Sequence, residues 1–415
     1  MNYKTILKNV VALAFGEFSS KAFGFLTMIY LAKTLGAEQF GMVGFVSAIA
    51  SYAVLFSNFG IEQYAAQRLS SHRFQDVRDL IGHVLSTRFL LSILLIIPFI
   101  IFGINYTSSI SVQWLFIFQS IFIIAYALNL QFYFVSQKKF TSLAIVKILT
   151  AGSILIVTWF FVTSPNDLAI VTFISGSVTF FVFVAAVLFI VKKEKIALSM
   201  PTMHGVRQLL SNAAPLGISA LMIQIYYSAD VIFLGFTNPG VELGYYTGVY
   251  RLILVLTLIS GFLYQIFLPE LAKLKENHFH QFQTKFYIVF MICTGGIITI
   301  VSYIWAYEIV KVILGSEYIL AVGVFNILLV NVFMVFVNVS FGSLLIVWNR
   351  HKEYLIVVSA GAMFNVIGNI ILIPHYGIYG AAISTVAAEC AVFLIAFYFN
   401  QKIFGLFNSK KATAF

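Results

Sequence analysis

Apolar residues occupy long runs along this chain, and charged residues are concentrated in short segments between the runs. A helix that crosses the ~30 Å hydrocarbon core of a bilayer needs about 20 mostly apolar residues, and we count twelve such runs. Alternating segments of about 10 residues, which are typical of membrane β-barrels, are absent. We therefore predict an all-α polytopic membrane protein. The predicted transmembrane helices cover residues 10–32, 41–66, 81–103, 113–135, 143–163, 168–191, 211–236, 245–268, 284–307, 320–347, 355–373 and 379–400.

The composition agrees with this prediction. Of the 415 residues, 61% are hydrophobic and 10% are charged, whereas charged residues make up about a quarter of a soluble domain. The first run follows Lys4 and Lys8, as in a secretory signal peptide, but it is too long for one and carries charges. We therefore expect it to be retained as a helix.

The basic residues are distributed unevenly between the loops. If the N-terminus is cytoplasmic, nineteen of the 25 Lys and Arg fall in cytoplasmic segments, and only Lys33 and Lys311 fall on the opposite side. Cytoplasmic loops of membrane proteins carry such an excess, so we predict that both termini are cytoplasmic. The net charge of +10 then reflects topology and does not indicate nucleic-acid binding.

A basic loop separates two groups of six predicted helices. Short stretches of the two halves are similar: residues 35–45 match 239–250, and residues 164–176 match 373–385. Six helices per half insert both halves in the same direction, which predicts two lobes around a central cavity. The expected segments are an N-terminal lobe at 1–195, a cytoplasmic inter-lobe loop at 196–210, and a C-terminal lobe with a short tail at 211–415.

Eight charged residues lie in the interior of the predicted spans, where each is costly unless it is paired or hydrated. Such residues are candidates for a substrate or ion path. The basic candidates, expected to bind an anionic substrate, are Lys21, Arg88, Lys147 and Arg251. The acidic candidates, expected to serve ion coupling or charge balance, are Glu17, Glu62, Asp230 and Glu389.

Spacing suggests partners for the charges of the first half. Glu17 and Lys21 are four residues apart and share one helical face. They either neutralise each other or face the cavity, where Lys21 would bind an anion and Glu17 would balance its charge. Arg88 lies about 10 Å from the cytoplasmic edge, and Glu62 is its candidate partner. Lys147 lies about 6 Å deep, so its ammonium can reach the interface.

The second half carries fewer cations and more amides. Arg251 and Asp230 lie near the far side on adjacent helices, which suggests a gating or structural pair. Glu389 lies near the midplane, and it is either a proton-coupling carboxylate or a buried neutral carboxyl that a neighbour holds. Asn365 and Asn369 share a face, and we expect such amides to tie helices together rather than to bind sugars.

Several functions are disfavoured by missing motifs. No G-x-x-x-x-G-K-[ST] segment occurs, so the chain lacks an ATP motor of its own. Cys293 and Cys390 both lie within predicted spans, which argues against a disulfide framework or a zinc site. No Cys/His pair or paired carboxylates lie in an accessible loop. We expect a transporter rather than an enzyme, without a cofactor or a resident metal.

Two segments resemble a known family, the Wzx-type polysaccharide transporters or O-antigen flippases. Residues 30–71 contain YLAKTLGAEQFGMVGF, which is similar to the Leu-Gly-x-x-x-Phe-Gly turn and aromatic-rich second helix of that family. Residues 375–390, HYGIYGAAISTVAAEC, resemble its Gly-x-x-Gly-Ala-Ala-x-x-Thr helix with an acidic residue. These motifs mark the wider multidrug/oligosaccharidyl-lipid/polysaccharide exporter superfamily.

The resemblance implies a flippase of the bacterial inner membrane. It would move undecaprenyl-pyrophosphate-linked O-antigen, or similar oligosaccharide units, from the cytoplasmic to the periplasmic leaflet by alternating access. A pyrophosphate is well matched to Lys and Arg. The lipid bilayer is a partner on this interpretation, and the O-antigen polymerase and chain-length regulator are implied as further partners.

Two alternatives stay open within the same superfamily. A multidrug/cation antiporter would need a cavity lined by carboxylates, whereas the four intramembrane bases here match the four acids in number. A lipid II flippase is suggested by residues 20–25, which resemble its Ser-Arg-x-x-Gly-Phe stretch with Lys21 at the position of the Arg. Thr27 departs from that pattern, because those proteins carry a further Arg there.

Overall fold

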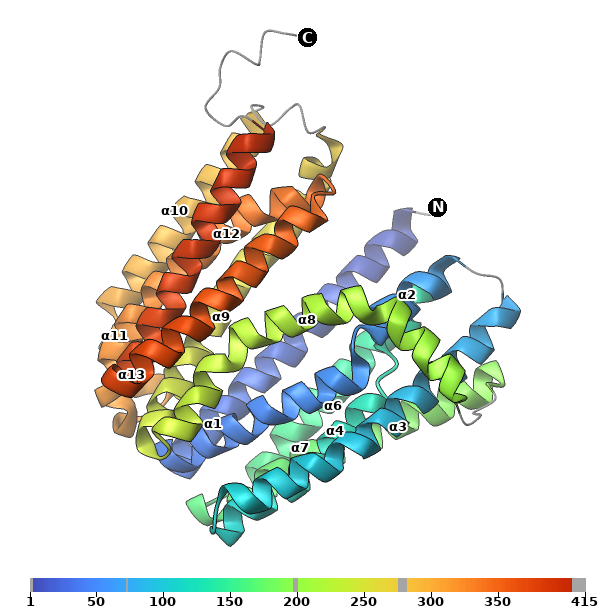
Figure 1. The fold of residues 1–415 in the computed structure, drawn as a ribbon, viewed down its shortest axis with the longest axis horizontal. Coiled ribbons are helices and arrows are strands. Elements are labelled where there is room, and N and C mark those ends of the chain that lie inside the picture. Colours follow the sequence, from blue (N-terminus) through green and yellow to red (C-terminus); the bar gives the residue numbers. More distant parts are fainter. Residues whose placement is uncertain (1–2, 72–73, 197–200, 275–281, 405–415) are drawn as a thin grey trace. The chain divides into compact units, whose positions relative to one another are not determined.

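The structure, a computed structural model, describes residues 3–71, 74–196, 201–274 and 282–404 (Figure 1). These residues form α-helices and short 3-10 turns, and they contain no strand, which confirms the predicted all-α fold. The elements in chain order are α1 (Tyr3–Asn58), α2 (Ile61–Ser71), α3 (Phe74–Tyr106), α4 (Ile110–Ala127), α5 (Gln131–Ser136), α6 (Phe140–Phe161), η1 (Pro165–Asp167), α7 (Leu168–Glu194), α8 (Met203–Thr237), α9 (Val241–Lys273), α10 (Phe282–Ile304), α11 (Ala306–Ile313), η3 (Ser316–Ala321), α12 (Val322–Val347) and α13 (His351–Phe404).

Ten helices in the described ranges are long and apolar enough to cross a membrane. Two of them, α1 and α13, each join two helices across a glycine. Gly36 has φ 76° and ψ 171°, and Gly377 has φ 52° and ψ −130°. Glycine adopts these conformations without the steric cost of a Cβ atom. With both arms of α1 and α13 counted separately, the structure contains the twelve predicted transmembrane helices.

The fourth predicted span is interrupted. α4 ends at Ala127 and α5 begins at Gln131, so residues 128–130 leave the helix inside the predicted range 113–135. The side chain of Asn129 accepts a hydrogen bond from the backbone N–H of Gln131 at 3.0 Å. Asparagine commonly makes such local bonds in place of helical ones. A polar residue within an apolar run thus restarts the chain as a separate short helix.

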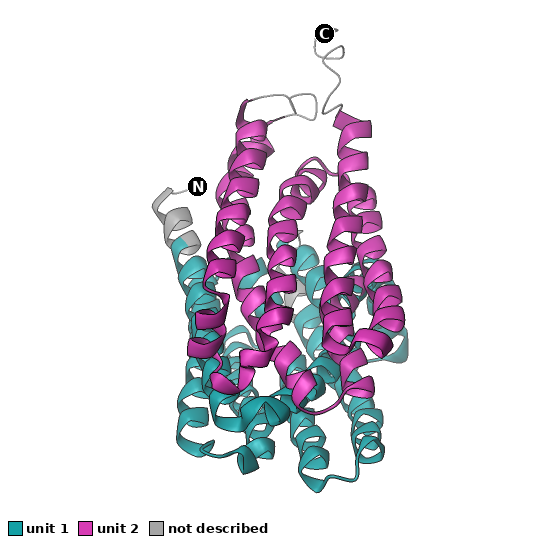
Figure 2. Ribbon diagram, turned by 90° about the vertical axis from the view of Figure 1, so that its left-hand side faces the viewer, with its two compact units in different colours: residues 1–221 teal, residues 222–415 magenta. Residues whose placement is uncertain are grey.

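The chain divides into two compact units, Met1–Leu221 and Met222–Phe415 (Figure 2). The boundary between the units, after Leu221, falls inside α8, which runs without a break from Met203 to Thr237. Residues 203–210 of the predicted inter-lobe loop are therefore helical, and residues 197–200 of that loop lie outside the described ranges. The chain ends at 1–2 and 405–415, whose cytoplasmic location is predicted, also lie outside them.

Each unit is held together by its own set of contacts between helices. In unit 1, α4 packs along α7 and α1 packs along α6, so segments far apart in the sequence lie side by side (Figure 1). In unit 2, α12 contacts α9, α10 and α13, and most of its side chains are buried. Large apolar side chains such as Phe160, Phe181 and Ile300 remain exposed. Outward apolar side chains are expected where helices face lipid.

Candidate functional site

Arg88 of α3 is completely buried at the place where α4 ends. Its guanidinium donates hydrogen bonds to the carbonyl oxygen of Tyr126 at 2.7 Å and to that of Asn129 at 2.9 Å. The last carbonyls of a helix have no partner within the helix and carry the negative end of its dipole. Arg88 therefore stabilises the break between α4 and α5. Its predicted contact with an anionic substrate stays a prediction.

Glu62 of α2 does not form the predicted ion pair with Arg88. The two terminal nitrogens of the Arg88 guanidinium donate to the two carbonyl groups instead, while its Nε has no hydrogen-bond partner. Arg88 and Lys147 are nevertheless the two cations that act electrostatically on the Glu62 carboxylate. The Tyr126 hydroxyl lies in the field of Glu62, Arg88 and Glu17. We refer to Glu17, Glu62, Arg88, Tyr126 and Lys147 as the unit 1 charge cluster.

Glu17 and Lys147 form an ion pair that links α1 to α6. The two helices approach very closely one residue before Glu17, because a Cβ atom on Gly16 would lie 2.5 Å from the Cβ of Ala144. Small residues permit such close contact between membrane helices, and Lys147 follows Ala144 by one helical turn. The pair is partly accessible, with side-chain exposures of 33% for Glu17 and 23% for Lys147. It is therefore within reach of a polar ligand.

Lys21 lies one turn beyond Glu17 on α1, and it is exposed. Gly24 follows on the same side of the helix, and a Cβ atom added there would meet no other atom within 4 Å. This face of α1 is open. An exposed lysine inside a membrane-spanning segment is costly next to hydrocarbon, so we interpret the face as one that contacts polar groups rather than lipid tails.

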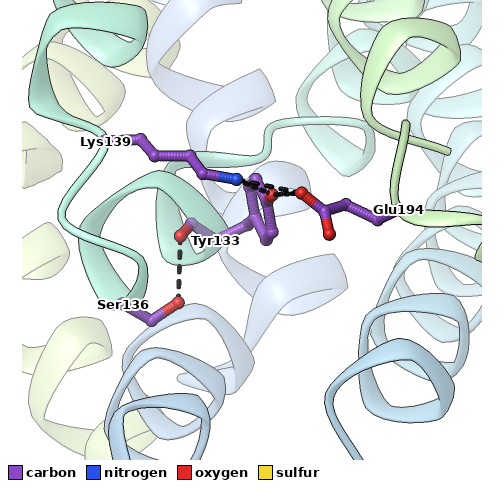
Figure 3. A network of polar contacts seen from close by, with 4 residues as sticks. All are labelled: Tyr133, Ser136, Lys139 and Glu194. Atoms are coloured by element: carbon purple, nitrogen blue, oxygen red, sulfur yellow. Dashed lines mark hydrogen bonds and ion pairs between the residues drawn. The ribbon is translucent and has the colours of Figure 1, made fainter. Parts of the chain in front are cut away.

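A second polar cluster of unit 1 lies where α5, α6 and α7 meet (Figure 3). Glu194, at the end of α7, accepts hydrogen bonds from the Tyr133 hydroxyl at 2.6 Å and from the Lys139 ammonium at 3.0 Å. The ammonium also bonds to the Tyr133 hydroxyl. The Ser136 hydroxyl donates to the Tyr133 carbonyl at 2.9 Å. These contacts join the short helix α5 to both of its neighbours.

Asp230 of α8 is the most extensively hydrogen-bonded carboxylate among the described residues of unit 2. It is buried, with 1% of its surface exposed, and it accepts four hydrogen bonds from neutral side chains. The donors are the hydroxyls of Tyr246 and Thr385 at 2.6 Å each, and the amides of Asn369 at 2.5 Å and Asn365 at 2.9 Å. The expectation that Asn365 and Asn369 tie helices together is confirmed, because both connect α13 to α8.

The predicted pairing of Asp230 with Arg251 is wrong. Arg251 on α9 is half-buried and is not one of the four donors to Asp230; it lies near Tyr318 of η3. The four neutral donors fully occupy the carboxylate oxygens, and this avoids the large cost of removing a second charge from water. Buried carboxylates are tolerated when hydrogen bonds replace their hydration.

Glu389 on the second arm of α13 is also buried, with 5% of its surface exposed. Asn338 of α12 donates its amide to the backbone carbonyl of Glu389 at 2.9 Å and to its carboxylate at 2.5 Å. The Oδ1 atom of Asn338 has no hydrogen-bond partner, and the Tyr226 hydroxyl lies beside the Glu389 carboxylate. Within the described residues no group of three His, Cys, Asp or Glu side chains is arranged for a metal ion.

Comparison with known proteins identifies the family. Residues 6–275 match the family of polysaccharide biosynthesis proteins. The chain belongs to this family. Two curated relatives carry the name "Putative O-antigen transporter": one from Escherichia coli (strain K12) is 25% identical over 97% of this chain and 99% of its own length. The other, from Shigella dysenteriae, is 22% identical over 93% of this chain and 98% of its own length.

Solved structures resemble this polysaccharide biosynthesis protein in fold. The lipid II flippase MurJ in an inward closed conformation has a TM-score of 0.76 at 14% identity, with 94% of this chain and 87% of that chain covered. An inward-facing multidrug resistance MATE family transporter of the MOP superfamily has a TM-score of 0.68 at 14% identity, with 98% and 100% covered. The predicted polytopic all-α fold is confirmed.

Sequence reasoning found the charged residues of this family member but missed most of their partners. Tyr126, Tyr246 and Thr385 carry no charge, so the search for intramembrane ionisable groups did not select them. Asn338 belongs to the amides of the second half, and its pattern in the sequence does not distinguish it from the others. The one available signal was the presence of polar side chains in otherwise apolar helices, because such groups must find partners when they are buried.

Proposed function

We propose that this protein is a flippase that moves undecaprenyl-pyrophosphate-linked oligosaccharide units of the O-antigen type from the cytoplasmic to the periplasmic leaflet by alternating access. The partly exposed ion pair between Glu17 and Lys147 carries the proposal, together with the exposed Lys21 on the same helix. Charged groups that remain accessible within a membrane span mark substrate or ion paths. The names of the curated relatives support the substrate class.

Each candidate base has a distinct place in the proposal. Lys21 and Lys147 bind the pyrophosphate, with Glu17 neutralising Lys147 when no substrate is bound. Lysine suits this exchange because its ammonium is a compact charge on a flexible stem. Arg88 acts in this conformation by shaping the α4–α5 break rather than by direct contact. Arg251 is the base that unit 2 supplies, and Glu62 and Asp230 balance charge in their units.

Transport of a labelled substrate tests the proposal directly. The purified protein is reconstituted in vesicles with a fluorescent undecaprenyl-pyrophosphate oligosaccharide, and an impermeant oxidant reports the fraction in the outer leaflet. We expect rapid exchange with the wild type and at least a tenfold slower exchange with Lys147→Ala. The matched control is Lys311→Ala, at an exposed lysine of α11 outside the charge cluster. Uptake of a cationic dye without lipid exchange would instead support the antiporter.

The orientation is tested by reporter fusions. Basic residues predict that Ser164 faces the periplasm and Lys195 the cytoplasm. A reporter that is active only in the periplasm should therefore show activity after Ser164 and none after Lys195. The reverse pattern would invert the proposed direction of loading.

We propose Glu389 as the coupling residue, since the chain has no ATP motif and must use an ion gradient, the membrane potential or product removal. A proton on this carboxylate would neutralise it while the empty carrier returns. In the vesicle assay, Glu389→Gln should permit exchange down a gradient and abolish accumulation driven by a pH difference. If the wild type ignores the pH difference, or the variant responds equally, proton coupling at this residue is excluded.

A further inference from the structure

A pocket of about 320 Å³ lies within unit 2, between α8, α9, α12 and α13. Its wall contains four tyrosines, Tyr226, Tyr227, Tyr264 and Tyr354, and its polar floor contains Glu389 and Asn338. No Lys or Arg lines it. Small-molecule sites usually span about 300–1,000 Å³, so this pocket suits a single ring.

One polar acceptor in the lining of the pocket has no hydrogen-bond partner. The Asn338 amide nitrogen is already engaged with Glu389, whereas its Oδ1 atom is unpartnered although the residue is only 8% exposed. The buried Tyr226 hydroxyl lies beside the Glu389 carboxylate. A buried acceptor left unpaired is costly, and native proteins seldom tolerate one without a function. The Asn338 Oδ1 atom therefore favours a ligand that supplies a hydroxyl donor.

The walls provide flat apolar surfaces and free space. The rings of Tyr226 and Tyr227 are nearly perpendicular, with centroids 5.4 Å apart. A Cβ atom on Gly342 would lie 3.6 Å from the Tyr354 ring, so this ring packs over the α12 backbone. At Gly261 of α9, an added Cβ atom would meet nothing within 4 Å. The space beside Gly261 belongs to the pocket.

We propose that this pocket binds one uncharged sugar ring of the transported oligosaccharide, with Glu389 and Asn338 accepting its hydroxyl groups and the tyrosines covering its apolar faces. This inference rests on the proposed function, and it adds a preference for neutral sugars over acidic ones. A sugar acid is rejected, because its carboxylate would meet Glu389 with no basic group in the lining to compensate. Like charges in a poorly hydrated site repel strongly. The sugar occupies Glu389 in the loaded carrier, and a proton occupies it on return.

Binding of simple glycosides to the purified full-length protein tests this site. Saturation-transfer NMR is recorded in nanodiscs with methyl α-glucoside, methyl α-galactoside, methyl α-rhamnoside and methyl N-acetylglucosaminide, and with methyl glucuronide as the acidic probe. We expect a signal from at least one neutral glycoside and none from the glucuronide. Tetramethylammonium is the cationic probe, and its binding in place of every neutral glycoside would overturn the proposal in favour of a cation site.

Variants locate the signal within the pocket. Gly261→Leu fills the free space without touching the polar groups, and it should remove the glycoside signal. Gly296→Leu is the matched control on α10, where an added Cβ atom would have its nearest neighbour at 3.9 Å; it should retain the signal. Glu389→Gln should weaken neutral glycoside binding about fivefold to tenfold, the usual difference between charged and neutral hydrogen bonds. It should also admit the glucuronide.

Folding of each variant is checked by its elution profile and thermal unfolding. Tyr226→Phe, which removes one hydroxyl only, replaces Gly261→Leu if the latter misfolds, and it should weaken glycoside binding about threefold. A glycoside signal that none of the pocket variants alters would place the sugar elsewhere. If the vesicle assay shows exchange but no glycoside binds, only the pocket proposal fails. If glycosides bind in a Gly261-dependent manner without lipid exchange, only the flippase proposal fails.

Discussion

The two units stabilise charges inside the membrane in different ways. In unit 1, charged groups meet other charges or backbone carbonyls: Glu17 pairs with Lys147, and Arg88 caps the end of α4. In unit 2, Asp230 and Glu389 are held by neutral amides and hydroxyls. An ion pair can exchange one partner for a charged ligand, whereas a carboxylate in a shell of neutral donors is fixed in place. The ion pair of unit 1 therefore suits an anionic group, and the carboxylate sites of unit 2 suit neutral ligands.

The largest expected effect is at Asp230. Asp230→Ala removes the shared acceptor of four buried donors. Thr385 and Asn369 keep second acceptors in Ala381 and Asn365, whereas Tyr246 and Asn365 lose their main acceptor. We expect a loss of about 4 kcal/mol in unfolding free energy, since each donor left unpaired costs roughly 1–3 kcal/mol. Unfolding in detergent measures the change. Glu242→Ala, at an exposed carboxylate of α9, is the control and should be near neutral. Equal stability of the two variants would contradict a structural role for the Asp230 shell.

Substitution of Arg88 tests whether a charged side chain also stabilises the fold of unit 1. Arg88→Leu uncovers the carbonyls of Tyr126 and Asn129, and we expect a loss of about 2–3 kcal/mol, the value typical of hydrogen bonds to charged groups. Arg88→Lys should restore part of it. The same unfolding measurement applies, with Arg207→Ala at an exposed position of α8 as the control. A stable Arg88→Leu variant without lipid exchange would instead assign Arg88 to substrate binding.

Variants of the ion pair between Glu17 and Lys147 should affect lipid exchange more than they affect the free energy of unfolding. A double-mutant cycle with Glu17→Gln and Lys147→Met should give a coupling energy of about 1 kcal/mol, because the pair is partly exposed to solvent. Lipid exchange should fall far more than stability does. If exchange follows stability in all three variants, the pair is a structural tie and not a substrate site.

The smallest expected effect is at the cluster of Tyr133, Lys139 and Glu194. Lys139 and Glu194 are 32% and 25% exposed, so removal of the ion pair by Lys139→Ala should cost about 0.5 kcal/mol. Lipid exchange should remain within twofold of the wild type. A severe loss of exchange here, with stability intact, would show that α5 moves during transport.

The halves also differ at the turns that the sequence predicted to be equivalent. Gly36 and Gly240 occupy matching positions in residues 35–45 and 239–250, and both have positive φ with extended ψ: 76° and 171° for Gly36, 105° and −146° for Gly240. The second predicted match is less close. Asp167 accepts hydrogen bonds from the backbone of Thr163 and Ser164, whereas Gly377 supplies a kink. The two halves thus share a positive-φ glycine at the first turn. At the second turn, the first half has hydrogen bonds to the Asp167 side chain, whereas the second half has the kink at Gly377.

The helices of this protein were predictable because their signal is local. Each span needs enough apolar residues to cover the hydrocarbon core, and every residue within the span contributes to that sum. The break at 128–130 was missed because it depends on Asn129 and on Arg88, which is 41 residues earlier in the chain. A hydropathy sum cannot register one side chain that binds the backbone of another helix.

The candidate site was only partly predictable for the same reason. The sequence by itself determined which charges enter the membrane, since a charged residue within an apolar run is visible in one dimension. It also determined that Asn365 and Asn369 share a face, because the helical period is fixed. Only the tertiary structure decided the partners of Glu17, Arg88 and Asp230 and gathered four tyrosines around Glu389. Those contacts depend on how helices distant in sequence pack, and the close approach of Gly16 to Ala144 is set by side-chain volumes on both helices at once.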